Sequence, residues 1–358
     1  MGHLSWLEAI VIGVLQGVSE LFPVSSLGHS VLLPAVIGGS WAQDLDISAD
    51  RSPYLAFIVG LHVATAIALV IYFWRDWVRV VRVVRVVRGL YTSIVRREVS
   101  DPDQRLAWLL VLGTIPVGLA GLLLEHVFRT VLAKPTPTAV FLILNGVVLL
   151  VGEHLRRRSA AAARPVGDHP AGLPDTATEV LRVPLDTPTE TITTSRPAGQ
   201  PAMVSGGPPS TREAGSDYVD ERISGPESDA RLARLPVGRA VLIGAAQIAA
   251  LAPGLSRSGL TMVTGLLRGL SHEDAARFSF LLSTPVIFAA GILKLGNLAG
   301  PLGDGIRGQI LVASLLSGVG AYLSVRFLTR WFATNSLRPF GIYCIVVGAG
   351  CLAWFALR

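Results

Sequence analysis

Long apolar runs separated by short polar segments recur along most of the chain. Six of them are long enough to cross the hydrocarbon core of a bilayer, which needs about 20 helical residues. We predict transmembrane helices at residues 54–74, 106–126, 138–155, 277–297, 307–328 and 338–357.

Two further apolar segments, residues 5–38 and 238–268, are interrupted by Pro, Gly and polar residues. Unpaired backbone groups are costly in hydrocarbon, so irregular backbone at membrane depth must be buried in protein or line water. We therefore expect each segment to form a re-entrant helical hairpin rather than a simple span.

The composition changes abruptly between the third and fourth predicted spans. Residues 156–236 are rich in Pro, Gly, Ser, Thr and acidic residues and have few large apolar ones. Such a segment cannot bury enough apolar surface to fold. We predict a disordered cytoplasmic insert at 156–236 between two membrane halves, residues 1–155 and 237–358. A regulatory role is open, but a tolerated insertion is favoured because long loops cost little to close.

The two halves resemble each other. With shifts of one residue, "IGVLQGVSELFPVSSLG" at 12–28 aligns with "IGAAQIAALAPGLSRSG" at 243–259. In each half this polar, Pro-broken segment is followed by three predicted spans. The chain is therefore expected to contain an internal repeat.

Arginine placement predicts the orientation of the halves. Arginines gather at 75–97, 156–158 and 326–338, and the positive-inside rule makes these regions cytoplasmic. Loops 39–53 and 298–306 are then outside, so the halves are inverted relative to each other. The predicted fold is an all-α integral membrane protein, an inverted-topology repeat with six transmembrane helices and two re-entrant hairpins. Such repeats place their site near the midplane, where broken helices meet.

Composition agrees with a membrane protein. Of 358 residues, 51% are hydrophobic and only 16% charged, against about one quarter charged in soluble domains. The pI of about 9.8 would suit nucleic acid, but the positive-inside rule accounts for the arginines, so we expect no nucleic-acid partner. Cys344 and Cys351 lie on one predicted helix, about 10 Å apart along its axis, which excludes a disulfide between them.

The second interrupted segment carries candidate phosphate-binding chemistry. In "PGLSRSGLT" the hydroxyls of Ser256, Ser258 and Thr261 surround Arg257 at a helix start. Hydroxyls and exposed N–H groups donate hydrogen bonds, and the guanidinium is a planar cationic fork. This pattern predicts an anion cradle.

The first interrupted segment, "ELFPVSSLGHS", carries candidate acid, base and hydroxyl groups. Glu20 and His29 form a candidate acid/base pair, and Ser25 or Ser26 could bind phosphate or attack it. Gln16 lies four residues before Glu20 on the same helical face, so it could orient the carboxylate or help ligate a cation.

Some of these residues also have structural interpretations. Glu20 and Arg257 could be only a buried ion pair between the hairpins, and Ser25 could merely satisfy backbone carbonyls. His62 and Glu125, on or beside apolar spans, are interpreted as structural contacts and left out of the site.

The motifs "QGVSE", "FPVSSLGH" and "PGLSRSG" resemble those of the bacitracin-resistance family of undecaprenyl-diphosphatases. These are Glu/Gln-x-x-x-Glu, Pro-Val-Ser-Ser-x-Gly-His and Pro-Gly-x-Ser-Arg-Ser-Gly, and the resemblance covers both halves. It implies an enzyme of the bacterial plasma (inner) membrane with its active site open to the outer face. Its substrate would be a C55 polyprenyl diphosphate lipid, hydrolysed to the monophosphate to recycle the cell-wall carrier. The implied site residues are Glu20, Ser26, His29, Arg257, Ser256 and Thr261.

From the resemblance and the residues together we expect catalytic roles for Glu20, Ser26, His29 and Arg257. A divalent cation, Mg²⁺ or Ca²⁺, would lie near Glu20 and Gln16. Many family members have Glu where this chain has Gln16, which weakens a two-carboxylate metal site. The attacking group is either Ser26 activated by His29, which we favour, or water activated by His29 or Glu20. Phosphate contacts are expected from Ser25, Ser256, Arg257, Ser258 and Thr261.

A lipid-phosphate transporter or flippase is the alternative function, because inverted repeats and a midplane anion site are also transporter features. The lipid bilayer is the expected environment in either case. The oligomeric state, a homodimer included, stays open at this point.

Overall fold

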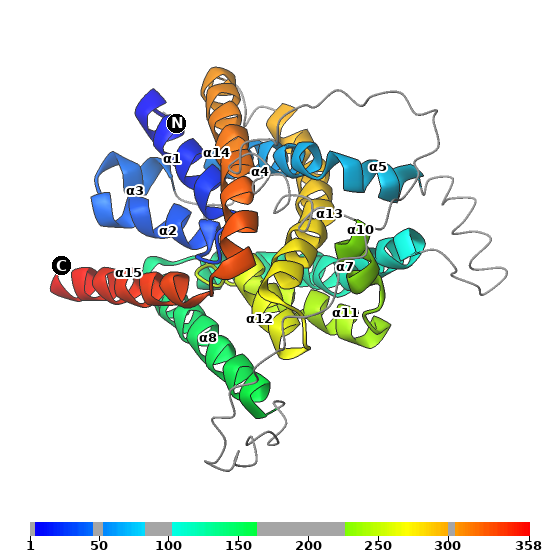
Figure 1. Cartoon of the computed structure of the whole chain (residues 1–358). Coiled ribbons are helices and arrows are strands. Elements are labelled where there is room, and N and C mark those ends of the chain that lie inside the picture. Colours follow the sequence, from blue (N-terminus) through cyan, green and yellow to red (C-terminus); the bar gives the residue numbers. More distant parts are fainter. Residues whose placement is uncertain (1–3, 46–52, 83–101, 163–225, 300–304) are drawn as a thin grey trace, which may run out of the picture.

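The computed structural model describes residues 4–45, 53–82, 102–162, 226–299 and 305–358, which are helical with no strand among them (Figure 1). This confirms the all-α prediction. The helices are α1 (Trp6–Ser19), α2 (Ser26–Ile37), α3 (Ser40–Asp44), α4 (Pro53–Tyr72), α5 (Trp74–Arg82), α7 (Pro102–Val127), η1 (Phe128–Leu132), α8 (Pro135–Ala162), α10 (Pro226–Ala233), α11 (Val237–Ala245), η2 (Ala246–Leu251), α12 (Arg257–Leu267), α13 (His272–Ala299), α14 (Arg307–Thr334) and α15 (Arg338–Leu357).

All six predicted spans are helices. Five of them, α7, α8, α13, α14 and α15, are long and apolar enough to cross a membrane. In α4 the continuous apolar stretch Phe57–Tyr72 is shorter. Together these helices are those of a multi-pass membrane protein.

The predicted insert differs from the structure at both margins. α8 continues to Ala162, and α10 begins at Pro226. Ser228 and Asp229 of α10 are buried; Ser228 donates a hydrogen bond to Asp274 (3.1 Å), and Asp229 pairs with Arg277 (2.6 Å). The polar composition of the region hides this helix, which buries only a few apolar residues, Leu232 and Ala233 among them, besides these polar contacts with α13. The prediction of disorder for the remaining residues, 163–225, lies outside the described residues.

Both interrupted segments are helix–turn–helix hairpins, α1–α2 and α11–η2–α12. In each hairpin a serine caps the second helix: Ser25 accepts a hydrogen bond from the Gly28 N–H (3.2 Å) and Ser256 from the Gly259 N–H (3.1 Å). Such caps satisfy backbone donors that would otherwise be orphaned at a helix start. The motif serines therefore cap α2 and α12 with the same side-chain hydrogen bond, although Ser25 has a positive φ and Ser256 is extended.

The helices of the two halves pack across each other. α1 lies against α14, while α11 lies against α7 (Figure 1). Glycines make both contacts close, because a Cβ on Gly17 would meet the Ser317 backbone and one on Gly244 would meet the Gly113 backbone. Each half thus supplies the packing surface for the hairpin of the other.

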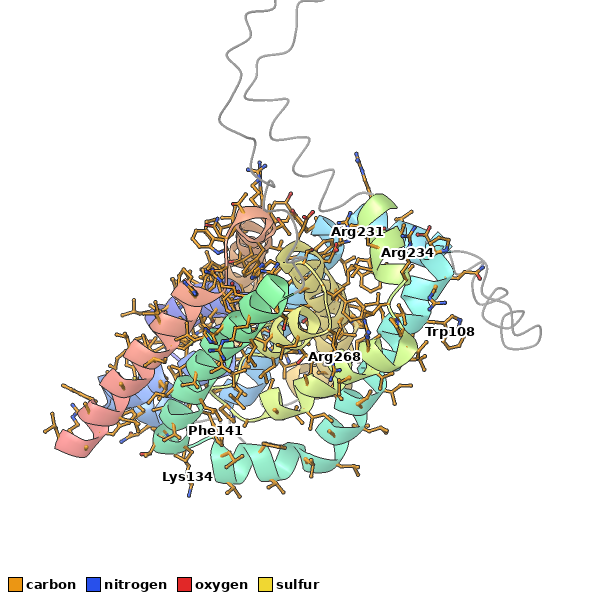
Figure 2. All side chains as sticks on the ribbon, turned by 60° about the horizontal axis from the view of Figure 1, so that its bottom comes forward. Trp108, Lys134, Phe141, Arg231, Arg234 and Arg268 are labelled. Atoms are coloured by element: carbon orange, nitrogen blue, oxygen red, sulfur yellow. The ribbon has the colours of Figure 1, made fainter. Side chains whose placement is uncertain are left out.

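α7 bends strongly between Trp108 and the region of Lys134, at the edge of the molecule (Figure 2). Pro116 lies inside this helix, and proline removes one backbone hydrogen bond and crowds the preceding turn. The bend lets α7 follow the outside of α11.

Two glycines of α11 provide a matched test of this packing. We expect Gly244→Ala to destabilise the protein by about 1–3 kcal/mol, since the new methyl overlaps the α7 backbone. Gly238→Ala adds the same methyl to the same helix in open space, so it should leave stability unchanged or slightly raised. Thermal unfolding in detergent measures both, and equal melting temperatures for the two variants would contradict the close approach.

Candidate active site

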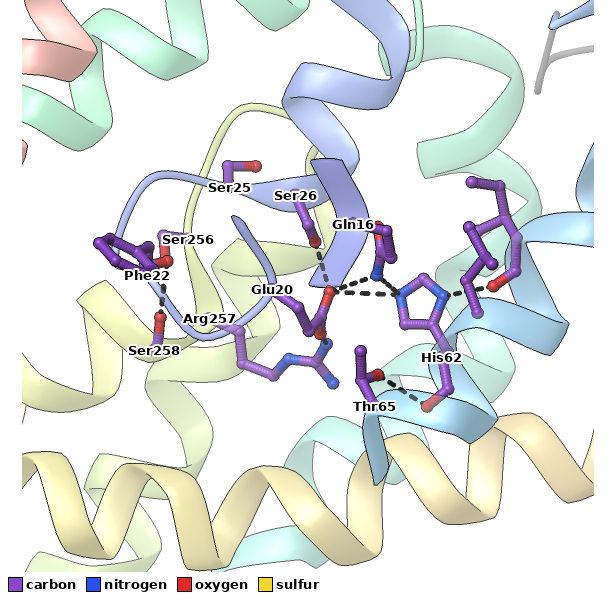
Figure 3. Close-up of polar contacts among 12 residues, drawn as sticks. Gln16, Glu20, Phe22, Ser25, Ser26, His62, Thr65, Ser256, Arg257 and Ser258 are labelled. Carbon is purple, nitrogen blue, oxygen red and sulfur yellow. Dashed lines mark hydrogen bonds and ion pairs between the residues drawn. The ribbon is translucent and has the colours of Figure 1, made fainter. Parts of the chain in front are cut away.

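The carboxylate of Glu20, at the C-terminal end of α1, is the centre of the site (Figure 3). Its side chain is only 2% exposed. The Ser26 hydroxyl donates to Oε2, and Arg257 Nη2 donates to Oε1 at 2.5 Å. Ser26 and Arg257 are the first residues of α2 and α12. One buried carboxylate therefore joins the starts of the second helices of both hairpins, as the motifs predicted.

Gln16 lies one turn before Glu20 and donates from Nε2 to Glu20 Oε2 at 2.7 Å. Its Oε1 is buried and has no hydrogen-bond partner in the structure. Gln16 thus contacts the carboxylate as the helical spacing predicted, and its Oε1 is the atom that could bind a cation.

His62 belongs to the site, although the sequence interpretation left it out as a structural contact. Its Nδ1 donates to the Ile58 carbonyl (2.8 Å), which can only accept, and Nε2 lies 3.5 Å from Glu20 Oε2 and 3.3 Å from Gln16 Nε2. The sequence alone does not show which face of α4 meets α1, so this contact with Glu20 and Gln16 was not predicted. An ionisable residue inside an apolar span was the available signal. The side chain of Glu125 lies outside the described residues.

His29 is not joined to Ser26 by any hydrogen bond that the described residues make. Its Nδ1 lies 2.7 Å from the Ser25 carbonyl, and its Nε2 lies 2.9 Å from the Tyr343 hydroxyl. Its ring also stacks on Tyr343, with centroids 5.7 Å apart. The structure therefore pairs Ser26 with Glu20 instead of the expected His29.

Ser25 connects the two hairpin turns. Its hydroxyl oxygen accepts from the Gly28 N–H and, across the hairpins, from the Gly254 N–H at 3.1 Å. Ser25 has a φ of +69°, a conformation that costs a non-glycine residue about 1–3 kcal/mol. Such strain persists where the surrounding contacts fix the backbone, as they do here.

The other predicted phosphate-binding hydroxyls contact the protein itself. Ser258 donates to the Phe22 carbonyl (3.2 Å) and lies 3.1 Å from the Ser256 hydroxyl. Thr261 donates to the Arg257 carbonyl (2.8 Å) and contacts Ser279 (2.5 Å). These contacts hold α12 against the first hairpin and α13. They therefore fix the backbone that carries Arg257.

Two groups at the site are partly exposed. The side chains of Arg257 and His62 are 23% and 22% exposed, whereas Glu20 is enclosed. The guanidinium uses Nη2 to bind the buried carboxylate, so its other N–H groups are available to donate to an anionic ligand.

The oxygen atoms of the site could bind a hard divalent cation only if the substrate or water supplied further oxygen ligands. No group of three or more His, Cys, Asp or Glu with metal-binding geometry occurs among the described residues. Mg²⁺ often takes one or two carboxylates and completes its shell with phosphate oxygens and water. Glu20 and the unpartnered Oε1 of Gln16 match that mode of binding.

This multi-pass helical membrane protein gathers a carboxylate, a hydroxyl and a guanidinium at two buried turns, the groups with which proteins bind and transfer phosphate. Residues 9–170 and 217–350 match the family model described as bacitracin resistance protein BacA, and the chain belongs to this family.

Curated relatives match the chain over nearly its whole length. The undecaprenyl-diphosphatase of Mycolicibacterium paratuberculosis is 56% identical over 356 residues, 99% of each chain. Undecaprenyl-diphosphatase 1 of Frankia casuarinae is 51% identical over 381 residues, 100% of each chain. Undecaprenyl-diphosphatase 2 of Chromobacterium violaceum is 37% identical over 347 residues, 96% of each chain.

Proposed function

We propose that this chain is an undecaprenyl-diphosphatase, which hydrolyses undecaprenyl diphosphate to undecaprenyl phosphate and inorganic phosphate. The reaction recycles the lipid carrier of cell-wall synthesis and accounts for bacitracin resistance. The names of the relatives support the substrate. The observation that carries the chemistry is the Glu20 carboxylate shared by Ser26 and Arg257.

Arg257 binds the diphosphate through its planar fork, which matches two phosphate oxygens. Glu20 Oε1 holds one side of the guanidinium, so the fork is oriented before the substrate arrives. Charge developing on the phosphoryl oxygens then meets a fixed cation, the main means by which phosphoryl transfer is catalysed.

Ser26 is positioned to act as the nucleophile, with Glu20 as its base. As the Ser26 Oγ–phosphorus bond forms, the anhydride P–O bond breaks, the lipid monophosphate leaves and the hydroxyl proton passes to Glu20 Oε2. Water then hydrolyses the phosphoserine. A water molecule activated by Glu20 is the competing route, in which Ser26 only donates a hydrogen bond.

A divalent cation, Mg²⁺ or Ca²⁺, would be held by Glu20 and Gln16 together with phosphate oxygens. When bound, it neutralises diphosphate charge and polarises the phosphoryl group. The buried oxygen of Gln16 supports this assignment.

We further propose an inverted-topology repeat in the bacterial plasma membrane, with α1–α2 and α11–α12 as re-entrant hairpins and the site open to the outer face. The reciprocal contacts of α1 with α14 and of α11 with α7 support it, as do the equivalent caps of α2 and α12. The arginine distribution supports the orientation.

Purified protein in detergent should release inorganic phosphate from C55 diphosphate, and a chelator should abolish the release. A lipid-phosphate transporter, the other candidate function, would bind the lipid without releasing phosphate. Phosphate release that persists in chelator would remove the cation from the proposal, and no release with added Mg²⁺ or Ca²⁺ would remove the diphosphatase.

Arg257→Lys keeps the charge but loses the planar fork, so we expect about a hundredfold lower kcat/KM, or about 3 kcal/mol of transition-state stabilisation. Arg268→Lys, at the exposed end of the same helix, is the control and should keep wild-type activity. If Arg257 were only the structural partner of Glu20, the lysine variant would retain most of its rate.

Ser26→Ala and Glu20→Gln should each lose nearly all activity, and the double variant should be no worse, because residues acting as one unit are non-additive. Ser30→Ala is the control, since Ser30 lies on the same helix and its hydroxyl has no hydrogen-bond partner. Retention of a tenth of the activity by Ser26→Ala would indicate attacking water. If His29→Ala also loses activity, and the double variant His29→Ala/Ser26→Ala is no worse than either single variant, then His29 rather than Glu20 is the base.

Single cysteines test the topology in intact cells with a membrane-impermeant thiol reagent. Gln43→Cys, in the exposed part of α3, should label from outside, whereas Asn335→Cys, between α14 and α15, should not. The unmodified chain is the control, because Cys344 is buried and Cys351 partly buried. Labelling of Asn335→Cys, or protection of Gln43→Cys, would contradict the proposed orientation.

A further inference from the structure

Asn145 lies in the middle of α8 within the apolar run "FLILNGVVLLV" and is fully buried. A buried amide is costly unless it is hydrogen-bonded, and inside a membrane such side chains bond across helices. The partners of this amide therefore show what it does.

Both ends of the Asn145 amide bond to the hairpin turns. Nδ2 donates to the Pro23 carbonyl at 3.0 Å, in the turn between α1 and α2, and also to Cys344 Sγ of α15 at 3.3 Å. Oδ1 accepts from the Ser256 N–H at 2.9 Å, at the start of α12. Pro23 lies between Glu20 and Ser26, and Ser256 directly precedes Arg257. A single side chain thus fixes both turns next to the site residues they carry.

The two turns also lie close together. A Cβ on Gly28 would lie 2.9 Å from the Gly254 Cα, and a Cβ on Gly259 would lie 3.3 Å from the Pro23 Cβ. A small relative shift of the hairpins would therefore change the distance of Arg257 from the groups on the first hairpin. Phosphoryl transfer depends on such positioning, and a misplacement of about 1 Å can cost a hundredfold in rate.

We propose that Asn145 is a positioning residue that holds Arg257 in register with Glu20 and Ser26 by bonding the Pro23 carbonyl and the Ser256 N–H. This inference rests on the proposed diphosphatase function. Asn145 does not contact the reacting groups, so it acts through the placement of Arg257.

Asn145→Leu keeps the approximate size of the side chain but removes the hydrogen bonds to Pro23 and Ser256, and with them the weaker one to Cys344 Sγ. We expect kcat for C55 diphosphate to fall about 10- to 100-fold, with KM changed less than about threefold, because the arginine still meets the diphosphate but is misaligned for the transfer. Thr284→Val is the matched control: Thr284 is also buried in a span, but it bonds only within its own helix, to the Phe280 carbonyl (3.0 Å). It should keep wild-type kcat.

A double-variant cycle separates positioning from general stability. In an Arg257→Lys background, Asn145→Leu should lower kcat less than about threefold further, because the group that Asn145 positions is already gone. The inference is overturned if the two single-variant losses in kcat multiply in full in the double variant, or if Asn145→Leu alone has wild-type kcat.

A second variant serves if Asn145→Leu is not recovered folded. Asn145→Asp keeps the acceptor for Ser256 but loses the donor to Pro23, and it is measured in the same cycle. Inactivity of the unmodified chain would instead contradict the diphosphatase function itself.

Discussion

The buried carboxylate of Glu20 is the group around which the two halves of the molecule are organised. A carboxylate enclosed among apolar helices is unfavourable unless charge and hydrogen bonds compensate it. Here the compensation comes from both hairpins, a guanidinium from one and a hydroxyl from the other. The need to compensate the buried charge of Glu20 thus both stabilises the site and brings its residues together.

This arrangement brings the turns of two helix–turn–helix segments together in the buried interior, where unpaired backbone groups are costly. The turns satisfy that condition through serine caps on α2 and α12, through Ser25 accepting from Gly254, and through the amide of Asn145. The polar residues around the site therefore divide into two groups. One group, Arg257 and His62, is partly exposed, and the other replaces the hydrogen bonds that a continuous helix would have made.

The sequence predicts those parts of the structure that depend on local pattern. Six apolar runs are helices because their length and composition leave few alternatives, and Glu20, Ser26 and Arg257 converge because the hairpins repeat one motif. His62 and Asn145 could not be placed in this way, since each lies on a span whose contacting face is decided by tertiary packing. The sequence motif suggested His29 as the base for Ser26 because the two residues are close in sequence. In the structure the His29 ring contacts Tyr343 on α15 instead. α10 was missed because it is short and mostly polar in sequence, although its Leu232 and Ala233 are buried and Asp229 pairs with Arg277.

The reciprocal packing of the halves has a consequence for synthesis. α1 leaves the ribosome first, but the helix that covers its glycine face, α14, is among the last to be made. Contacts so distant in sequence form slowly because a long loop must close before they contribute. During synthesis α1 and α2 are therefore made well before α12 and α14. A nascent chain that ends before α12 has the Glu20 carboxylate without Arg257, so it lacks the ion pair that compensates this charge in the folded protein.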